Sequence, residues 1–364
     1  MFRKLFRIRP KKFLGIDIGT SYIKVVELRR KGSGARLENY GELGILYPKK
    51  KPFRIFEKDT LLLSDQDVAV VIQKICQEAG VQTKEVNFSI PDFATFFTTF
   101  KIPEMTKDEI PEAIQHEARP YIPLPFSEIT LDWVVIEGEP GRTPLKVLVA
   151  AIPNDVIRQY EEIARIARLN LKTLEPEVFA LARSLKPLWT KKNGDNNKVF
   201  ALIDIGARST TFNILEQGVL KLSHSFSIGS NELTEMLARA LNISSVEADD
   251  LKAKKGIAPA VGSEKDDNVR ELLLPLVDNM ISETKKIFRT FFQNEGKEVE
   301  KIVLAGGIAF LPGLKDYFAQ ELQRETLIAD PFSGISYPSA LAETLKNSGP
   351  SFAVAVGLAL KGFE

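Results

Sequence analysis

The same short pattern occurs twice in this chain, once near its start and once near its middle. Residues 13–28 and residues 199–215 each contain an apolar strand, the sequence Ile-Asp-Ile-Gly, small hydroxyl residues and a second apolar strand. Two strands joined by a glycine-containing turn predict a β-hairpin. One such hairpin is weak evidence, because any hairpin can have Asp and Gly at its turn. Two hairpins in matching contexts predict a chain built from two related halves.

The turn of each hairpin suits a phosphate group. Gly19 and Gly206 allow the backbone to approach a phosphate closely and to adopt conformations closed to other residues. The backbone amides that follow can then point at phosphate oxygens and form an anion-binding concavity. Lys24 can face the phosphates too, although on a strand it can equally point to solvent. The predicted phosphate contacts are Gly19, Thr20, Ser21, Lys24, Gly206, Ala207, Ser209 and Thr210.

Each hairpin also places an aspartate just before its glycine. Asp17 and Asp204 cannot usefully contact phosphate directly, since both groups are anionic. They can hold the waters of a Mg²⁺ ion, which prefers oxygen ligands and keeps several waters. We therefore expect Asp17 and Asp204 at a magnesium site. The alternative is two unrelated hairpins that merely end in Asp and Gly.

Size and composition limit the classes of protein to consider. At 364 residues the chain exceeds the usual size of one hydrophobic core, which predicts two domains or one bilobed body. Lys and Arg total 49 against 48 for Asp and Glu, and a net charge of +1 is too small to attract nucleic acid or membrane. Cys76, His116 and His224 supply too few soft ligands for a structural zinc site.

Five motifs together resemble the actin, heat-shock protein and sugar-kinase superfamily. The two hairpins resemble its phosphate-1 and phosphate-2 motifs. Residues 174–182 resemble the first connecting helix, residues 301–314, with Gly306 and Gly307, the adenosine motif, and residues 352–360 the second connecting helix. The resemblance covers residues 13–364. It implies an α/β, bilobed, actin-like (ribonuclease H-like) ATPase fold with two related halves, and ATP with Mg²⁺ between them.

An insertion narrows the resemblance. Residues 101–150 read as a helix and strands, and resemble the 1C subdomain of FtsA and of PilM, the type IV pilus assembly protein. Residues 117–125, the Leu-Asp-Trp sequence at 131–133 and the basic start of the chain are most similar to PilM. FtsA-like proteins usually continue into a linker and an amphipathic membrane helix, which we do not expect after Glu364.

These patterns predict a layout for the whole chain. We expect a basic arm at 1–12, a first half at 13–100 and 151–190, the 1C-type insertion at 101–150, a linker at 191–198, a second half at 199–230 and 300–350, an outer subdomain at 231–299, and a C-terminal connecting helix at 351–364. The arm alternates basic and apolar residues. It either touches anionic lipid or is a solvated terminus.

The resemblance also implies contacts with nucleotide. Gly229 and Asn231 match a glycine-helix segment that approaches it, and Lys252 matches the lysine of an Ala-Glu-x-x-Lys helix that meets adenosine, with Asp249 in place of Glu. The alternative for Asp249 and Lys252 is a solvated helix face. Glu175 is the candidate that orients the attacking water, with Asp204 at the metal. Alternatively, the Glu-Pro pair only begins a helix.

The resemblance to PilM-like proteins implies a function. Such a protein lies at the cytoplasmic face of the inner membrane and binds the cytosolic N-terminal tail of PilN beside the 1C subdomain, with other inner-membrane pilus components and possible self-association. ATP binding is expected, with at most slow hydrolysis. Membrane contact is indirect or through the basic arm. The aromatic cluster Phe93, Phe96, Phe97 and Phe100 either lines the peptide groove or is buried. An FtsA-like cell-division filament and a small-molecule kinase are the alternatives.

Overall fold

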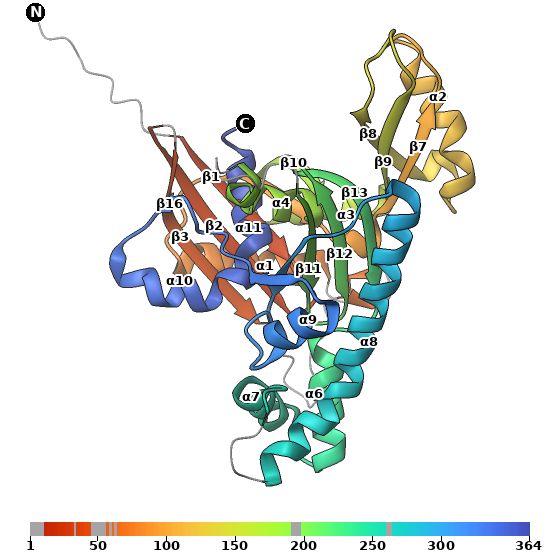
Figure 1. Cartoon of the computed structure of the whole chain (residues 1–364). Helices are drawn as coiled ribbons and strands as arrows, with labels where there is room; N and C mark the ends of the chain where they lie inside the picture. The colour runs from red at the N-terminus through yellow and green to blue at the C-terminus, as the bar shows by residue number, and fades with distance from the viewer. Residues whose placement is uncertain are drawn as a thin grey trace, which may run out of the picture.

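The computed structural model describes residues 11–32, 34–44, 56–57, 60–61, 64–190, 198–259 and 264–364. Two β-sheets stand beside each other with helices around them (Figure 1). Most of the predicted basic arm and residues 191–197 of the predicted linker lie outside the described residues. In the part that is described, no helix has the length and apolar character needed to span a membrane.

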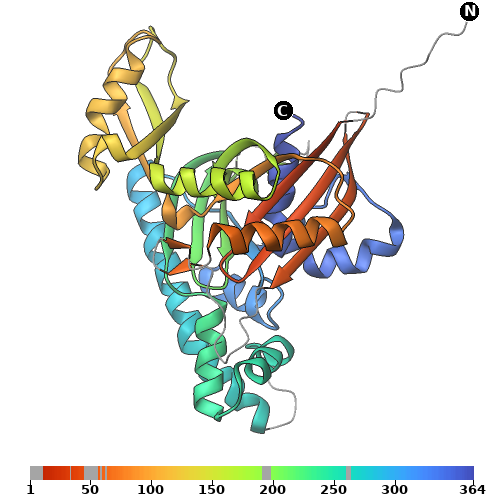
Figure 2. The ribbon, with the colours of Figure 1, turned by 180° about the vertical axis from the view of Figure 1, so that it is seen from behind.

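The first sheet has six strands in the order β10-β6-β1-β2-β3-β16. Helices α1 and α3 cover one face, where Val68, Ile72 and Ile163 pack against Leu14 and Ile16 of β1 (Figure 2). The elements are β1 (Lys12–Ile18), β2 (Tyr22–Lys31), β3 (Gly34–Gly44), α1 (Asp65–Glu78), β6 (Glu85–Ile90), α3 (Asn154–Ile166), β10 (Asn170–Pro176), β16 (Ile335–Ser336) and α10 (Ala342–Ser348), with a separate pair of short strands, β4 (Phe56–Glu57) and β5 (Thr60–Leu61).

The second sheet repeats the strand order of the first. Its order is β13-β12-β11-β14-β15, and the pairs β11/β12 and β12/β13 are antiparallel while β11/β14 and β14/β15 are parallel. The strands β3, β2, β1, β6 and β10 follow one another with the same directions. This confirms the two related halves. The elements are β11 (Val199–Ile205), β12 (Thr210–Glu216), β13 (Val219–Phe226), β14 (Lys301–Gly306), α9 (Leu314–Leu322) and β15 (Glu325–Ile328).

Two helices cross closely between the sheets, as the small residues of the connecting motifs predict. They are α4 (Glu177–Ser184) and α11 (Ala353–Lys361). A Cβ added at Gly357 of α11 would lie 1.8 Å from the backbone oxygen of Ala180 in α4. A Cβ added at Gly15 of β1 would lie 2.1 Å from the backbone oxygen of Ala355. Glycine at these positions lets α11 contact both α4 and the first sheet.

The insertion forms a small sheet with its own core, which projects from the body (Figure 1). Its strands lie in the order β7-β9-β8, and Ile110 and Ile114 of α2 pack on Val147 and Val149 of β9. The subdomain begins earlier and ends later than the predicted range 101–150, because the strand pairs run from Phe96 to Pro153. The elements are η1 (Asp92–Ala94), which precedes it, β7 (Phe96–Ile102), α2 (Ile110–Glu117), η2 (Arg119–Tyr121), η3 (Phe126–Glu128), β8 (Ile129–Glu137) and β9 (Leu145–Pro153).

Three helices form the outer part of the second half, and a later segment returns to the first half. We predicted that residues 300–350 belong to the second half. Instead, Phe332, Ile335 and Leu345 pack against Val26 and Leu28 of β2, and β16 pairs with β3. An apolar pattern shows that a segment is buried but not against which sheet. The remaining elements are α5 (Pro187–Thr190), α6 (Ser230–Leu241), α7 (Ser245–Lys255), α8 (Glu264–Glu295), η5 (Ser339–Leu341) and η6 (Gly349–Phe352).

Candidate functional site: a cleft between the two halves

A cleft of about 1240 Å³ lies between the two halves. The turns of both Ile-Asp-Ile-Gly hairpins line it, one from each half. Helix α7 and the turn after β14 complete its walls. The predicted site residues that line it are Asp17, Gly19, Thr20, Ser21, Lys24, Asp204, Gly206, Ala207, Ser209, Asn231, Lys252, Gly306 and Gly307.

The two hairpin turns have the same geometry. The amide of Gly19 donates to the backbone oxygen of Tyr22 at 3.0 Å, and the amide of Gly206 donates to that of Ser209 at 2.9 Å. In the strand register, Asp17 lies opposite Lys24 of the same hairpin, and Asp204 lies opposite Thr211. The half-buried Lys24 lines the cleft rather than facing open solvent. The two motifs therefore place one turn and one carboxylate each at the same cleft.

Two predicted contacts hold the second turn in place instead of lining the cleft. Thr210 is buried, and its hydroxyl donates to the backbone oxygen of Ile228 at 2.7 Å. A Cβ added at Gly229 would lie 2.7 Å from the carbonyl of Ala207, so glycine lets α6 begin against the turn. The amide of Asn231 also donates to the backbone oxygen of Ala207 at 2.8 Å. The neighbouring Thr211, which the sequence analysis missed, lines the cleft.

Lys252 braces two helices of the cleft wall. Its side chain is 4% exposed. Its ammonium donates to the hydroxyls of Ser230 at 2.6 Å and Thr234 at 2.7 Å, and to the carboxylate of Asp249 at 2.6 Å. Burial lowers the pKa of Lys252, and the hydrogen bond that its ammonium donates to Asp249 acts against this. The three N–H groups of the ammonium can each donate to one of these oxygens. Lys252 therefore connects α7 to α6 and is not a solvated surface lysine.

A group of carboxylates lies at the base of the cleft. Asp17, Asp204 and Glu177 line it, and Asp92 lies behind them, where its Oδ1 accepts the amide of Val178 at 3.1 Å. Burial raises the pKa of Asp17, opposed by the charge of Lys24, and raises the pKa of Asp204 to about 6. Burial and mutual repulsion raise the pKa of Asp92 to about 7 and that of Glu177 well above its usual range. Such a group suits a cation.

A cation at this place would be held largely through water. Among the residues that the structure describes, no three acidic, histidine or cysteine side chains converge closely enough to hold a metal ion directly. Mg²⁺ keeps several of its waters in protein sites, so carboxylates that contact it only through those waters still fit it.

Glu175 does not line the cleft, in contrast to its expected role. The guanidinium of Arg183 binds both of its carboxylate oxygens, at 2.9 Å for Nη2 to Oε2. The same guanidinium donates to the backbone oxygen of Gly357 at 3.1 Å and to Glu364 at 2.9 Å. The backbone changes direction where β10 ends and α4 begins, so Glu177 faces the cleft instead. Both glutamates flank Pro176, and the sequence contained no signal to choose between them.

The four clustered phenylalanines are packed against neighbouring side chains. Phe100 lies in the core of the insertion with Phe96 against it, and Phe97 contacts Phe179 of α4. Phe93 lines the cleft, with the guanidinium of Arg208 5.8 Å above its ring. The buried alternative therefore describes Phe100, whereas Phe93, Phe96 and Phe97 are half-buried.

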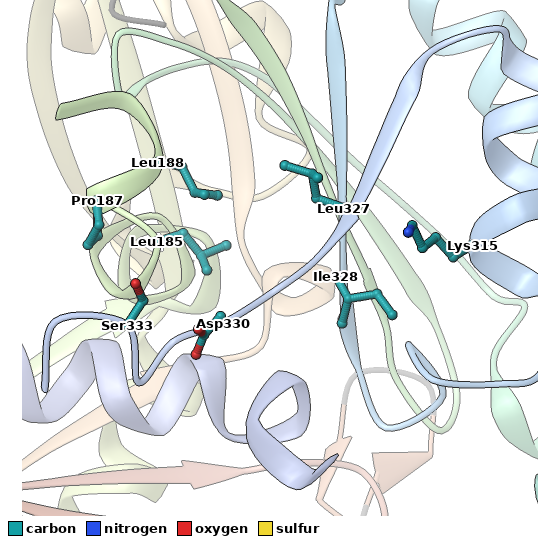
Figure 3. Close-up of a pocket in the computed structure, with 8 residues that line it drawn as sticks. All are labelled: Leu185, Pro187, Leu188, Lys315, Leu327, Ile328, Asp330 and Ser333. Atoms are coloured by element: carbon teal, nitrogen blue, oxygen red, sulfur yellow. The ribbon is translucent and has the colours of Figure 1, made fainter. Parts of the chain in front are cut away.

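A second, smaller cavity lies away from the cleft. It has a volume of about 350 Å³, lies between the end of α4 and strand β15, and is largely apolar (Figure 3). Lys315 and Asp330 are the charged residues among those that line it. It contains none of the predicted site residues.

The raised pKa values predict that the protein without bound ligands loses stability as pH rises. In the native state Asp204 titrates near about 6 and Asp92 near about 7, against 3.8 for an ordinary aspartate. Between these values the native state holds protons that the unfolded chain has released, so the free energy of unfolding falls as pH rises from about 4 to about 7. Urea denaturation at about pH 5 and pH 8 measures this. A higher midpoint at pH 8, or an unchanged difference in Asp92→Asn, would contradict it.

Comparison with known proteins adds to this geometry. The family model described as type IV pilus assembly protein PilM matches residues 15–363. The cell division protein FtsA of Rhizobium meliloti (strain 1021) is 29% identical over 178 residues, which are 43% of this chain and 39% of that protein. The chain thus matches well under half the length of this curated relative.

Two solved structures show the same architecture. A PilM–PilN type IV pilus biogenesis complex superposes with a TM-score of 0.83 at 24% identity, covering 96% of this chain and 98% of that one. MreB5 of Spiroplasma citri bound to ADP has a TM-score of 0.53 at 14% identity, covering 97% and 96%. These likenesses confirm the predicted actin-like fold.

Proposed function

Because the chain belongs to the type IV pilus assembly protein PilM family, we propose that it binds ATP between its halves and the N-terminal tail of a PilN-like membrane protein at its insertion. One observation carries the nucleotide part: two equivalent hairpin turns line a single cleft together with the carboxylates of Asp17, Asp204 and Glu177. The actin-like relative MreB5 was solved with ADP. FtsA is the weaker alternative, since its similarity covers 43% of the chain.

The cleft offers suitable groups to each part of a magnesium nucleotide. The turn amides at 20–21 and 207–209 would donate to phosphate oxygens, since those of Gly19 and Gly206 close their own turns, and the ammonium of Lys24 adds a positive charge. Asp17 and Asp204 would hold the waters of Mg²⁺, and the bound ion would reduce the repulsion between the phosphate groups. Gly306 brings β14 against these acids, since a Cβ there would lie 2.5 Å from Oδ1 of Asp204.

The adenosine would lie on the wall formed by the turn after β14 and by α7. No atom lies within 4 Å of a Cβ added at Gly307, which leaves an open surface for a flat ring. Ile308, Phe310 and Leu311 follow it and line the cleft. Lys252 acts here by positioning α7 against α6.

Hydrolysis, if it occurs, would use Glu177 rather than Glu175. A carboxylate near the phosphates can orient the attacking water. Glu177 lines the cleft, whereas Arg183 neutralises Glu175. We propose that nucleotide mainly sets the angle between the halves and that slow hydrolysis resets it.

The insertion is the proposed site for the partner tail. In the sheet order β7-β9-β8, the strand β8 has a neighbour on one side only, among the strands described. An extended peptide can pair with such an edge through backbone hydrogen bonds. Binding a membrane protein in this way would hold the chain at the cytoplasmic face of the inner membrane, beside the other pilus components.

Calorimetric titration with a synthetic peptide of the PilN-like tail tests the partner part. We expect saturable binding that is absent with a scrambled peptide. Val134→Lys on β8 is expected to weaken binding at least about tenfold, because it places a charge on the contact surface. Val70→Lys on α1 is the matched control, since Val134 and Val70 are both 49% exposed. Equal affinity for the scrambled peptide would refute the proposed partner.

A further inference from the structure

The insertion belongs to the first half by sequence but is joined to the second half by charged side chains. Lys221 of β13 lies 2.7 Å from Glu137 of β8. Lys146 of β9 lies 2.5 Å from Glu295, the last residue of α8. Helix α8 runs along the second half and ends beside the insertion in both overall views (Figures 1 and 2). Two ion pairs thus cross from the insertion to the second half.

The two lysines are withdrawn from water. The side chain of Lys221 is 6% exposed and that of Lys146 is 12% exposed, whereas Glu137 is 49% exposed. Lys146 is also 3.7 Å from Glu137. Surface ion pairs contribute little, but a charge withdrawn from water depends on its partners.

The charges alternate along the boundary. Glu216, which ends β12, lies 3.6 Å from Lys221 and also pairs with Lys297. In order along the boundary the groups are Glu295, Lys146, Glu137, Lys221, Glu216 and Lys297, and we call this set the charged clamp.

An apolar contact beneath the clamp connects it to the cleft. Leu220, next to Lys221, packs with Leu148 of β9 and with Val178 of α4. Val178 directly follows Glu177, which lines the cleft. The start of α4 therefore contacts the clamp on one side and the candidate nucleotide site on the other.

We propose that the charged clamp makes the affinity of the insertion for its partner peptide depend on bound nucleotide. This inference rests on the proposed function. A change in the angle between the halves moves Lys221 and Glu295 with the second half, and their ion pairs carry the insertion along. Without the clamp, the insertion binds its peptide with the same affinity whether or not nucleotide is present.

The double variant Lys146→Met, Lys221→Met tests this proposal. Methionine keeps the length of the side chain, and replacing both lysines leaves no unpaired lysine in the boundary. Glu137, at 49% exposure, remains hydrated without them. The matched control is Lys172→Met, Lys285→Met, which removes two ion pairs, with Glu85 and Glu321, that are more exposed than those of the clamp lysines and lie away from the insertion. Both double variants change the net charge equally.

Calorimetry with the synthetic tail peptide, with and without a non-hydrolysable magnesium ATP analogue, is the first measurement. In the wild type and the control we expect the two dissociation constants to differ by at least about fivefold, a typical allosteric coupling. In the clamp variant we expect less than about a twofold difference, with both ligands still bound. A retained difference in the clamp variant, or none in the wild type, overturns the proposal.

A distance measurement separates failure of this proposal from failure of the proposed function. Two spin labels are attached to cysteines introduced by Lys107→Cys in the insertion and Asp316→Cys in α9. Both positions are exposed, and Cys76→Ser removes the native cysteine. We expect the ATP analogue to change the distance between the two labels in the wild type, and to change it by a different amount in the clamp variant. If the peptide does not bind, the partner assignment is refuted, and the label distances alone decide for or against the clamp.

Discussion

Replacing Gly357 with valine is expected to lower the free energy of unfolding by about 4 kcal/mol or more, or to prevent folding. A Cβ at this position would lie 1.8 Å from the backbone oxygen of Ala180, and 2.4 Å from its carbonyl carbon. These are backbone atoms of a buried helix, so no flexible side chain can move aside. Inserting atoms into a packed core costs about 1–3 kcal/mol, and more where the backbone must shift. Urea denaturation followed by circular dichroism measures the loss.

The same substitution at Gly34 is the control. A Cβ there would lie 3.7 Å from its nearest neighbour, the backbone oxygen of Lys31, and the residue is exposed at the start of β3. We expect Gly34→Val to change stability by less than about 0.5 kcal/mol, as is usual at exposed sites. Wild-type stability in Gly357→Val would show that α4 and α11 do not cross as closely as described.

Much of the architecture could be predicted because the two halves repeat one pattern. The hairpins at 13–28 and 199–215 gave the same turn, the same acid and the same place in each sheet. Their expected convergence on one cleft agrees with the residues that line it. A local pattern was sufficient here because a hairpin is formed by neighbouring residues.

Residues 332–352 show where a local pattern is insufficient. The predicted layout placed most of them in the second half, but β16 pairs with β3 of the first half, about 300 residues earlier in the chain. Whether such a segment packs on the nearer or the more distant sheet depends on the space available there. That information is not contained in the periodicity of the segment itself.

The prediction of individual site residues was limited because the sequence does not show the direction in which each side chain points. Glu175 and Glu177, like Thr210 and Thr211, are close in sequence but point to different surroundings. Successive residues of a strand face opposite sides, and the end of a strand changes the direction again. The sequence therefore predicts which segment reaches the cleft more reliably than which side chain does.

Asp204→Asn is expected to weaken the binding of magnesium ATP at least about tenfold, equal to about 1.4 kcal/mol. The amide keeps the size of the side chain but removes the negative charge proposed to hold the waters of Mg²⁺. The same change should make the unliganded protein more stable near neutral pH, because burial and repulsion from Asp17 disfavour the charged form of Asp204. Opposite effects on binding and stability distinguish loss of a ligand site from damage to the fold.

Calorimetric titration of ATP with and without Mg²⁺, together with urea denaturation of the unliganded protein, measures both effects. Asp316→Asn is the matched control, since Asp316 is exposed on α9 and lines neither the cleft nor the smaller cavity. For this control we expect wild-type binding and stability. If Asp204→Asn binds ATP as tightly as the wild type and keeps the full dependence on Mg²⁺, the metal does not lie between the two hairpins. The repeated aspartate would then act only through the fold, by packing against Gly306 where β14 meets β11.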